Sequence, residues 1–222
     1  IEARTRKLFE VCRLRDIPII TFINKMDRES RDIFDLLDEI EKTLALDTTP
    51  MTWPVGRGRD FLGTYDLSTG GVRLLEGGGA KTGAAQQIEI ADLAGRNPNL
   101  DVGLVKEELA LVSEACKPFE LKAFREGHLT PVYFGSALRN FGVGDLLEGL
   151  GHFAPPPRSQ ESNLRKVEAS EPRMSAFVFK IQANMDPNHR DRIAFARLCS
   201  GKLTRGMKVK LVRTGKNMSL SS

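Results

Sequence analysis

The sequence has 222 residues, of which 41% are hydrophobic, so it can bury a substantial core in one or two domains. It contains no stretch with the length and apolar character of a transmembrane helix and no signal-peptide pattern, which predicts a cytoplasmic protein with no membrane partner. The three cysteines are odd in number and far apart, and the chain has only three histidines, so we expect reduced thiols and no metal site.

The net charge of +4 is unevenly distributed along the chain. Residues 1–157 carry 19 Lys and Arg against 24 Asp and Glu (net −5), whereas residues 158–222 carry 14 against 5 (net +9). This asymmetry predicts that the C-terminal segment faces a polyanion, with RNA as the expected partner. A solvated basic surface without a partner is the alternative. The candidates for RNA contact are Arg190, Arg192, Lys202, Arg205, Lys208 and Lys210.

Near the start of the chain, apolar residues at positions 3–14 predict an amphipathic helix that packs on a sheet. Residues 17–23 then form an apolar run bounded by charge, which predicts a parallel strand buried on both faces. The polar residues Asn24, Lys25 and Asp27 follow directly. They would lie at the carboxyl end of the strand, where open α/β sheets bind ligands.

The spacing Asn-Lys-x-Asp at residues 24–27 is that of the guanine-recognition motif of GTP-binding proteins. Guanine presents two adjacent donors, N1–H and the N2 amine, and the ionised carboxylate of Asp27 can accept from both, whereas adenine offers no such pair. The stem of Lys25 can lie along the base, and the Asn24 amide can donate to the base and tie neighbouring loops together. The alternative is a polar turn with no ligand.

A helix is predicted after this motif. Ser30 is the expected N-cap, and apolar residues repeat at helical spacing through residues 33–44 beneath an acidic outer face. We interpret these carboxylates as a solvated surface and not as a metal cluster.

The pattern changes from residue 48 onwards and predicts a small antiparallel sheet. Short strand-like runs separated by glycine occupy residues 52–56, 61–67 and 72–75. Residues 77–83 contain Gly, Lys and Thr but lack the G-x-x-x-x-G-K-[ST] spacing, so we interpret them as a hairpin loop. Residues 104–125 indicate one or two helices, which complete an inserted α+β subdomain over residues 48–127.

The parallel sheet resumes with a predicted strand at residues 130–134, followed by a turn of small residues at 135–138. In a guanine site the backbone amides of Ser136 and Ala137 would lie near the guanine O6. A plain strand-to-helix turn is the alternative. Leucines at helical spacing predict a helix over residues 143–153.

A proline-rich run ends this helix, and residues 156–172 are predicted as a linker between domains. The segment 173–222 alternates in the manner of strands and predicts the start of an all-β barrel. Its expected strands are residues 176–183, 193–199 and 207–212. The α/β domain would then comprise residues 1–47 and 128–155.

The order of these features resembles that of the translational GTPases: a guanine motif, a long insertion, a Gly-Ser-Ala-Leu turn, a proline-rich linker and a barrel. Residues 52–56, 140–143 and 177–192 resemble the bacterial peptide chain release factor 3 family in particular. The resemblance implies an α/β fold that is the C-terminal part of a P-loop GTPase domain with an inserted α+β subdomain, followed by the first strands of an all-β barrel.

The resemblance also implies a GTP hydrolase that binds GTP and GDP and acts on the ribosome and its RNA, where it removes and recycles class-I release factors. The sequence shows no G-x-x-x-x-G-K-[ST] loop, switch segment or Mg²⁺ ligand in context. We therefore expect a fragment with no catalytic residue and no hydrolysis of its own, and Mg²⁺ only in the intact parent. The alternatives are a translocation GTPase like elongation factor G and a non-enzymatic RNA-binding fragment with a vestigial guanine motif.

Overall fold

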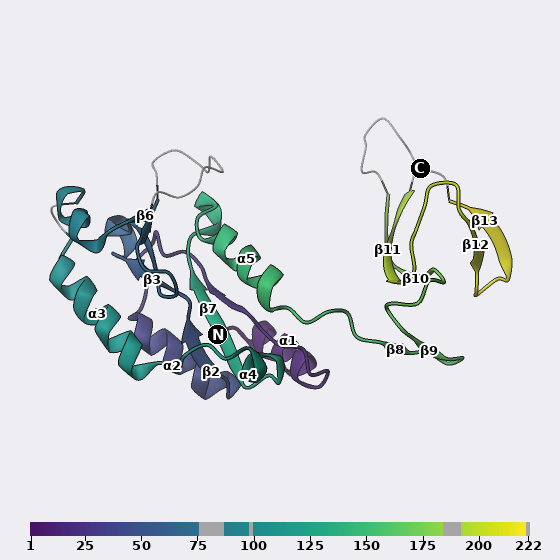
Figure 1. Cartoon of the computed structure of the whole chain (residues 1–222), viewed down its shortest axis with the longest axis horizontal. Helices are drawn as coiled ribbons and strands as arrows, with labels where there is room; N and C mark the ends of the chain where they lie inside the picture. Colours follow the sequence, from purple (N-terminus) through teal and green to yellow (C-terminus); the bar gives the residue numbers. More distant parts are fainter. Residues whose placement is uncertain (76–86, 98–99, 184–191, 221–222) are drawn as a thin grey trace. The chain divides into compact units, whose positions relative to one another are not determined.

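The computed structural model describes residues 1–75, 87–97, 100–183 and 192–220, which belong to two compact units, Ile1–Pro155 and Pro156–Ser222 (Figure 1). The division falls inside the run of prolines at residues 155–157. Among the described residues, no helix combines the length and the apolar character needed to cross a membrane.

A parallel three-stranded sheet forms the centre of the first unit (Figure 1). Its strands are β1 (Thr21–Ile23), β7 (Leu129–Phe134) and β2 (Asp47–Pro50), in the order β1-β7-β2. Every residue of β7 is buried, which is typical of a middle strand whose two faces are both covered. The strand predicted at residues 130–134 is therefore confirmed.

Strand β1 is shorter and less buried than the sequence predicts. The expected strand at residues 17–23 contracts to Thr21–Ile23, and its residues are only half-buried. Ile17 is 47% exposed. Among the described strands β1 pairs with β7 alone, so one of its edges has no partner. Pro18 also lacks the N–H that would extend the ladder. The predicted parallel strand is confirmed at Thr21–Ile23, but its predicted length and full burial are wrong.

Helices cover both faces of the parallel sheet. They are α1 (Ala3–Arg13), α2 (Ile33–Leu44) and α5 (Val143–Phe153). Phe9 of α1 and Ile40 of α2 are buried in one cluster, whereas Tyr133 of β7 meets α5. There the backbone of Gly149 approaches so closely that an added Cβ would lie 2.1 Å from the Tyr133 hydroxyl oxygen. Only glycine fits at this contact.

Helix α2 is capped by Asp32 and not by Ser30. The Asp32 carboxylate accepts a hydrogen bond from the Phe34 N–H at 2.9 Å. A carboxylate satisfies a free N–H of the first turn and also interacts favourably with the helix dipole. The apolar period of the helix is as predicted, because Ile33, Leu37 and the residues that follow at helical spacing are buried.

A four-stranded antiparallel sheet follows β2, in agreement with the sequence prediction. Its strands, in sheet order, are β3 (Thr52–Val55), β4 (Gly63–Asp66), β5 (Val72–Leu74) and β6 (Gln87–Ile88), and the helices that follow are α3 (Val102–Ala115) and α4 (Leu121–Arg125). The expected start of the insertion at residue 48 falls inside β2, which belongs to the parallel sheet. The predicted loop at 77–83 lies outside the described residues.

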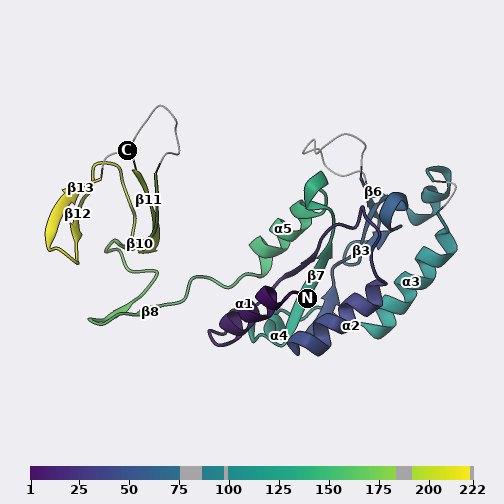
Figure 2. The ribbon, with the colours of Figure 1, turned by 180° about the vertical axis from the view of Figure 1, so that it is seen from behind.

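The inserted sheet shares a hydrophobic core with the parallel sheet. Trp53 and Phe61 are buried in one cluster with Met26 and with Phe134 of β7, and the ring centroids of Trp53 and Phe134 lie 5.7 Å apart. Helices α2 and α3 lie side by side in both views (Figures 1 and 2), and Val112 of α3 joins the same cluster. The insertion therefore packs directly on the elements that carry the guanine motif.

The second unit contains three antiparallel strand pairs among its described residues. They are β8 (Gln160–Glu161) with β9 (Lys166–Val167), β10 (Ser175–Ala183) with β11 (Arg192–Ser200), and β12 (Lys208–Leu211) with β13 (Lys216–Ser219). The three expected strands are present as β10, β11 and β12. The predicted linker contains the β8–β9 hairpin, and β13 was not predicted because its residues are mostly polar. These pairs do not close a barrel within the described residues.

Tyr133→Phe should make the stability of the protein less sensitive to alkaline pH. Burial first, and then the nearby carboxylates of Asp145, Asp66 and Glu148, raise the pKa of Tyr133 from 10.0 to about 12. Above pH 10 the unfolded chain releases this proton while the folded protein retains it, so the free energy of unfolding falls as the pH rises towards 12. Phenylalanine keeps the ring and has no proton to lose.

Urea unfolding at several pH values from below 10 up to about 12 measures the effect. The wild type should lose more stability than Tyr133→Phe across the range, and the two should lose it equally below pH 10. Parallel profiles across the whole range would show that Tyr133 titrates alike in the folded and unfolded chains.

Candidate functional site

The two polar segments noted in the sequence meet at the carboxyl ends of β1 and β7. These strands are parallel neighbours, and Ile23 is paired in register with Phe134. Asn24 follows the first strand and Gly135 follows the second, so both loops begin at the same edge of the sheet. This edge is where open α/β sheets bind ligands.

Hydrogen bonds join the two loops across this edge. The side-chain oxygen Oδ1 of Asn24 accepts from the backbone N–H of Lys25 at 2.7 Å and from that of Ala137 at 2.8 Å. The N–H of Met26 donates to the carbonyl of Gly135 at 3.1 Å. Lys25 itself has φ 70°, in the left-handed region, which turns the chain sharply after Asn24. The structure therefore brings the predicted residues Asn24 and Ala137 together.

The turn after β7 requires glycine at its two ends. An added Cβ at Gly135 would lie 2.3 Å from the Phe141 carbonyl oxygen, and one at Gly142 would lie 2.4 Å from that of Phe134. Ser136 and Phe141 exchange backbone hydrogen bonds between these glycines. A side chain at either glycine would push the two backbone segments of the turn apart, so glycine at both ends is needed for this conformation.

Both backbone amides expected near guanine O6 already donate within the protein. The Ser136 N–H donates to the Phe141 carbonyl at 3.0 Å, and the Ala137 N–H donates to Asn24. The Ser136 hydroxyl is buried, and among the described residues it has no hydrogen-bond partner. The direct contact of these amides with the base stays a prediction.

Asp27, the expected specificity residue, lies beside this site with most of its side chain covered. Its side chain is 13% exposed, and one carboxylate oxygen lies 3.7 Å from Nε of Arg139, whose own side chain is 53% exposed. The sequence reasoning missed Arg139, which occupies the 3-10 turn Ala137–Arg139 directly after the predicted Ser136. Its place in the sequence gave no signal of this contact, because the contact depends on how two loops approach each other. The exposed Arg139 side chain thus lies close to the largely covered carboxylate of Asp27.

The candidate RNA-binding residues lie in the second unit. Arg192 is on β11, Lys202 and Arg205 are in the connection to β12, and Lys208 and Lys210 are on β12. All five are exposed, and the two lysines of β12 lie on one face because side chains alternate along a strand. Arg190 lies outside the described residues.

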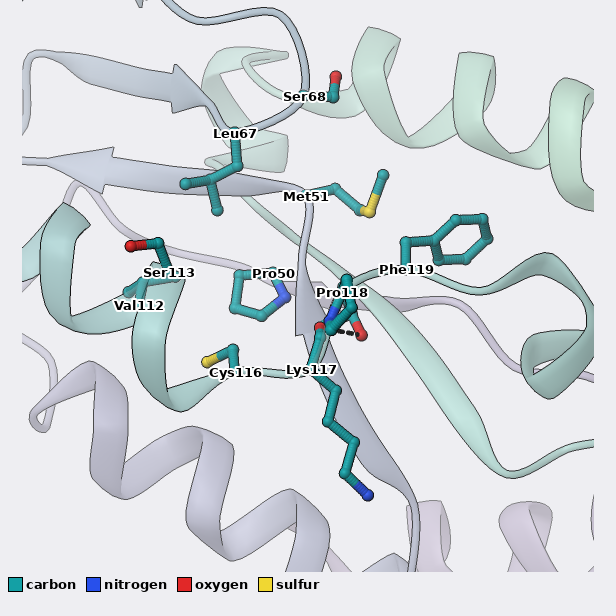
Figure 3. A pocket seen from close by; sticks show the side chains of 11 residues that line it. Pro50, Met51, Leu67, Ser68, Val112, Ser113, Cys116, Lys117, Pro118 and Phe119 are labelled. Atoms are coloured by element: carbon teal, nitrogen blue, oxygen red, sulfur yellow. Dashed lines mark hydrogen bonds between the residues drawn. The ribbon is translucent and has the colours of Figure 1, made fainter.

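A cavity of about 400 Å³ lies at the end of β2, lined also by the chain after β4, the end of α3 and the chain that follows it (Figure 3). Met51, Cys116 and Phe119 are among its lining residues. Burial first, and then the charge of Glu41, raise the pKa of the Cys116 thiol, so it is protonated and a poor nucleophile at neutral pH. No cluster of His, Cys, Asp and Glu among the described residues could hold a metal ion. The Cys116 thiol thus does not mark the cavity as a catalytic site.

A parallel α/β sheet whose neighbouring strands carry two joined polar loops at their carboxyl ends has the arrangement of nucleotide-binding α/β domains. Residues 1–156 match the family described as the elongation factor Tu GTP binding domain, and residues 173–222 match elongation factor G domain 2. The chain therefore belongs to the translational GTPase family of elongation factors Tu and G. The predicted α/β class with a following β domain is confirmed at this level.

Among solved structures, a crystal structure of a protein from Thermus thermophilus is similar over 99% of this chain, with a TM-score of 0.66 and 22% sequence identity. The chain spans 33% of the length of that protein. At this identity the similarity concerns the fold alone.

Asn24→Ala should release the turn after β7 from the guanine motif. The substitution removes the oxygen that accepts from Lys25 and Ala137, and the lost Ala137 contact should raise amide hydrogen exchange at Ala137 by about three- to tenfold. Asn24→Asp keeps an acceptor at the same position and is the matched control. Equal exchange in the alanine variant and the wild type would show that other contacts order the turn.

Proposed function

We propose that the loops after β1 and β7 bind the base of a guanine nucleotide and that Asp27 is the residue that recognises it. The observation that supports this most is the hydrogen bond between the Ala137 amide and the Asn24 side chain, because it holds the two loops in one site. The Asp27 carboxylate follows Asn24 in the same loop and has the two acceptor oxygens that guanine N1–H and N2 require.

The charge at the site fits this role. Arg139 approaches Asp27 only to 3.7 Å and is half-exposed, so the ion pair is weak in solvent and can be exchanged for the two hydrogen bonds of the base. An adenine base would displace water without supplying the pair of adjacent donors that the carboxylate can accept from. A site of this kind discriminates by roughly four to five orders of magnitude in good cases.

We propose that GTP hydrolysis belongs to the intact protein and not to these 222 residues alone. Phosphoryl transfer needs a phosphate-binding loop, a bound Mg²⁺ and a positioned nucleophile, and the sequence shows no G-x-x-x-x-G-K-[ST] motif. GTP and GDP are the expected nucleotides, with Mg²⁺ bound in the intact protein only. By itself the chain should bind GDP weakly and hydrolyse no GTP.

For the biological role, we propose translation termination in the cytoplasm, where the protein acts on the ribosome to remove and recycle class-I release factors. Family membership supports action on the ribosome, and the likeness of residues 52–56, 140–143 and 177–192 to release factor 3 favours recycling. Translocation in the manner of elongation factor G is the alternative. Assays of release-factor recycling and of translocation, run with the full-length protein on the same ribosomes, separate the two.

Asp27→Asn in the full-length protein should exchange guanine preference for xanthine preference. The variant replaces one acceptor oxygen by an NH₂ donor that faces the guanine N2 amine, so GTP affinity should fall by at least about tenfold because a charge-assisted pair is lost. Xanthine has a carbonyl at that position, and the new amide can donate to it. Paired titrations of wild type and variant with guanosine and xanthosine triphosphates measure the change.

An equal loss of affinity for both nucleotides would mean that Asp27 supports the loop and does not recognise the base. A wild-type protein that binds GDP no better than ADP would instead favour the non-enzymatic RNA-binding alternative.

Lys208→Ala combined with Lys210→Ala should weaken binding of the full-length protein to ribosomes. Both side chains are exposed on one face of β12, and each lost phosphate contact should flatten the salt dependence of affinity by about one unit in slope. Lys106→Ala, on the exposed surface of α3 in the acidic unit, is the charge-matched control. An unchanged slope in the double variant would leave a solvated surface as the role of these lysines.

A further inference from the structure

Met26, inside the guanine motif, belongs to the core of the inserted sheet. Its side chain is fully buried in one cluster with Trp53 and Phe61. Its carbonyl accepts a hydrogen bond from the N–H of Gly58 at 3.1 Å. The residue between Lys25 and Asp27 is therefore held by the insertion through its backbone and its side chain.

Gly58 comes from the tight turn between β3 and β4, which lies directly on the guanine loop. A Cβ built on Gly58 would lie 3.5 Å from the Glu29 amide nitrogen and 3.6 Å from the Arg28 carbonyl carbon, which is ordinary van der Waals contact. Gly58 has φ 58°, a conformation that glycine adopts without strain. The contact between the turn and the loop is thus made by backbone atoms on both sides.

Arg57, the neighbour of Gly58, adds a second attachment at the other end of the loop. One guanidinium nitrogen, Nη1, lies 2.9 Å from the Asp32 carboxylate, and Nη2 lies 2.8 Å from Glu108 of α3. Glu108 also accepts from the indole N–H of Trp53 at 3.0 Å. Because Asp32 caps α2, the Arg57 side chain links the insertion to the start of the helix that follows the guanine motif.

The protonation of Asp32 agrees with this attachment. Burial alone would raise the pKa of the carboxyl, but the hydrogen bonds from Arg57 and from the Phe34 N–H outweigh it and hold the pKa below its ordinary value. The Asp32 carboxylate is therefore ionised at neutral pH, as both of its contacts require. Because Glu108 accepts from the other terminal nitrogen, each of the two Nη atoms of Arg57 has a carboxylate acceptor. This geometry suits the planar guanidinium group.

We propose that the Arg57–Gly58 turn of the inserted sheet holds the guanine loop in the position that recognises the base, and thereby slows the release of guanine nucleotide. Arg57 is a positioning residue, since it acts on the base through Met26, Asp32 and the loop between them. The proposal rests on the proposed guanine site. It assigns to the insertion a direct part in nucleotide exchange.

The first test uses hydrogen exchange in the 222-residue chain and needs no nucleotide. Arg57→Gln removes the charged double contact, and exchange at the amides of Met26 and Gly58 should accelerate by about tenfold, while the strands of the parallel sheet keep their protection. The matched control is Lys117→Ala. This variant removes the ion pair of Lys117 with Asp47, whose atoms lie 2.7 Å apart. The pair also joins the inserted subdomain to the parallel sheet, but Asp47 is on β2, away from the guanine loop.

Unchanged exchange at Met26 and Gly58 in Arg57→Gln would overturn the proposal. So would a uniform acceleration over the whole first unit, because that pattern belongs to general destabilisation. Arg57→Lys keeps the charge but loses the two-armed contact, and an intermediate acceleration is expected for it.

The second test measures dissociation of a fluorescent GDP from the full-length protein. Arg57→Gln should release GDP about five- to tenfold faster, and Lys117→Ala should release it at the wild-type rate. Wild-type release in Arg57→Gln, in a protein that binds GDP and responds to Asp27→Asn as expected, would overturn this inference and leave the guanine site standing. A wild-type protein without guanine preference would instead overturn the proposed function itself.

Discussion

The hydrogen bond between the Asn24 side chain and the Ala137 amide joins two loops that lie 113 positions apart in the sequence. It is possible only because β1 and β7 are parallel neighbours and end at the same edge of the sheet. The entropy lost in closing so long a loop grows only slowly with its length, and here most of the intervening chain is itself folded. The geometry of the site therefore depends on the pairing of two strands that the insertion separates.

Local patterns in the sequence were sufficient where one segment determines its own structure. The period of apolar residues predicted α2, and the run before Asn24 indicated a strand that delivers the guanine motif. Predictions of element ends were wrong where two nearby residues could both cap a helix, or where a proline inside an apolar run limited the length of a strand. Asp32, with its carboxylate next to the first apolar residue, caps α2 in place of Ser30. Strand β1 is shorter than its apolar run, since Pro18 within that run has no N–H to donate to a ladder.

Contacts between distant segments could not be predicted from local patterns. The sequence placed Asn24 and Asp27 in the site, because a fixed spacing of polar residues after a strand is a local signal. The pairing of Asp27 with Arg139, and of Arg57 with Asp32, depends on how loops approach one another in three dimensions. No period or spacing encodes that approach. The exposed basic residues of the second unit show the same limit, because charge indicates a kind of partner without giving the contact.

The inserted sheet also holds the second loop of the site, through Arg73 of β5. The Arg73 guanidinium forms an ion pair with Asp145, in the first turn of α5, and lies 3.5 Å from Asp66 of β4. Burial, more than the neighbouring carboxylates, raises the pKa of Asp145, whose side chain is 11% exposed, while Arg73 opposes the shift. Without that cation, an ionised carboxylate would stay buried and unpaired, which is strongly destabilising.

Helix α5 begins directly after the turn that carries Ala137, so the Arg73 contact fixes the helix end nearest to that turn. Arg57 attaches the same insertion to the loop that carries Asp27. One inserted element thus contacts both halves of the site through charged side chains, and it contacts Met26 between them through the shared hydrophobic core. A movement of the insertion relative to either loop would change the distance between the Asn24 side chain and the Ala137 amide. The insertion is for this reason part of the proposed guanine site and not an appendage to it.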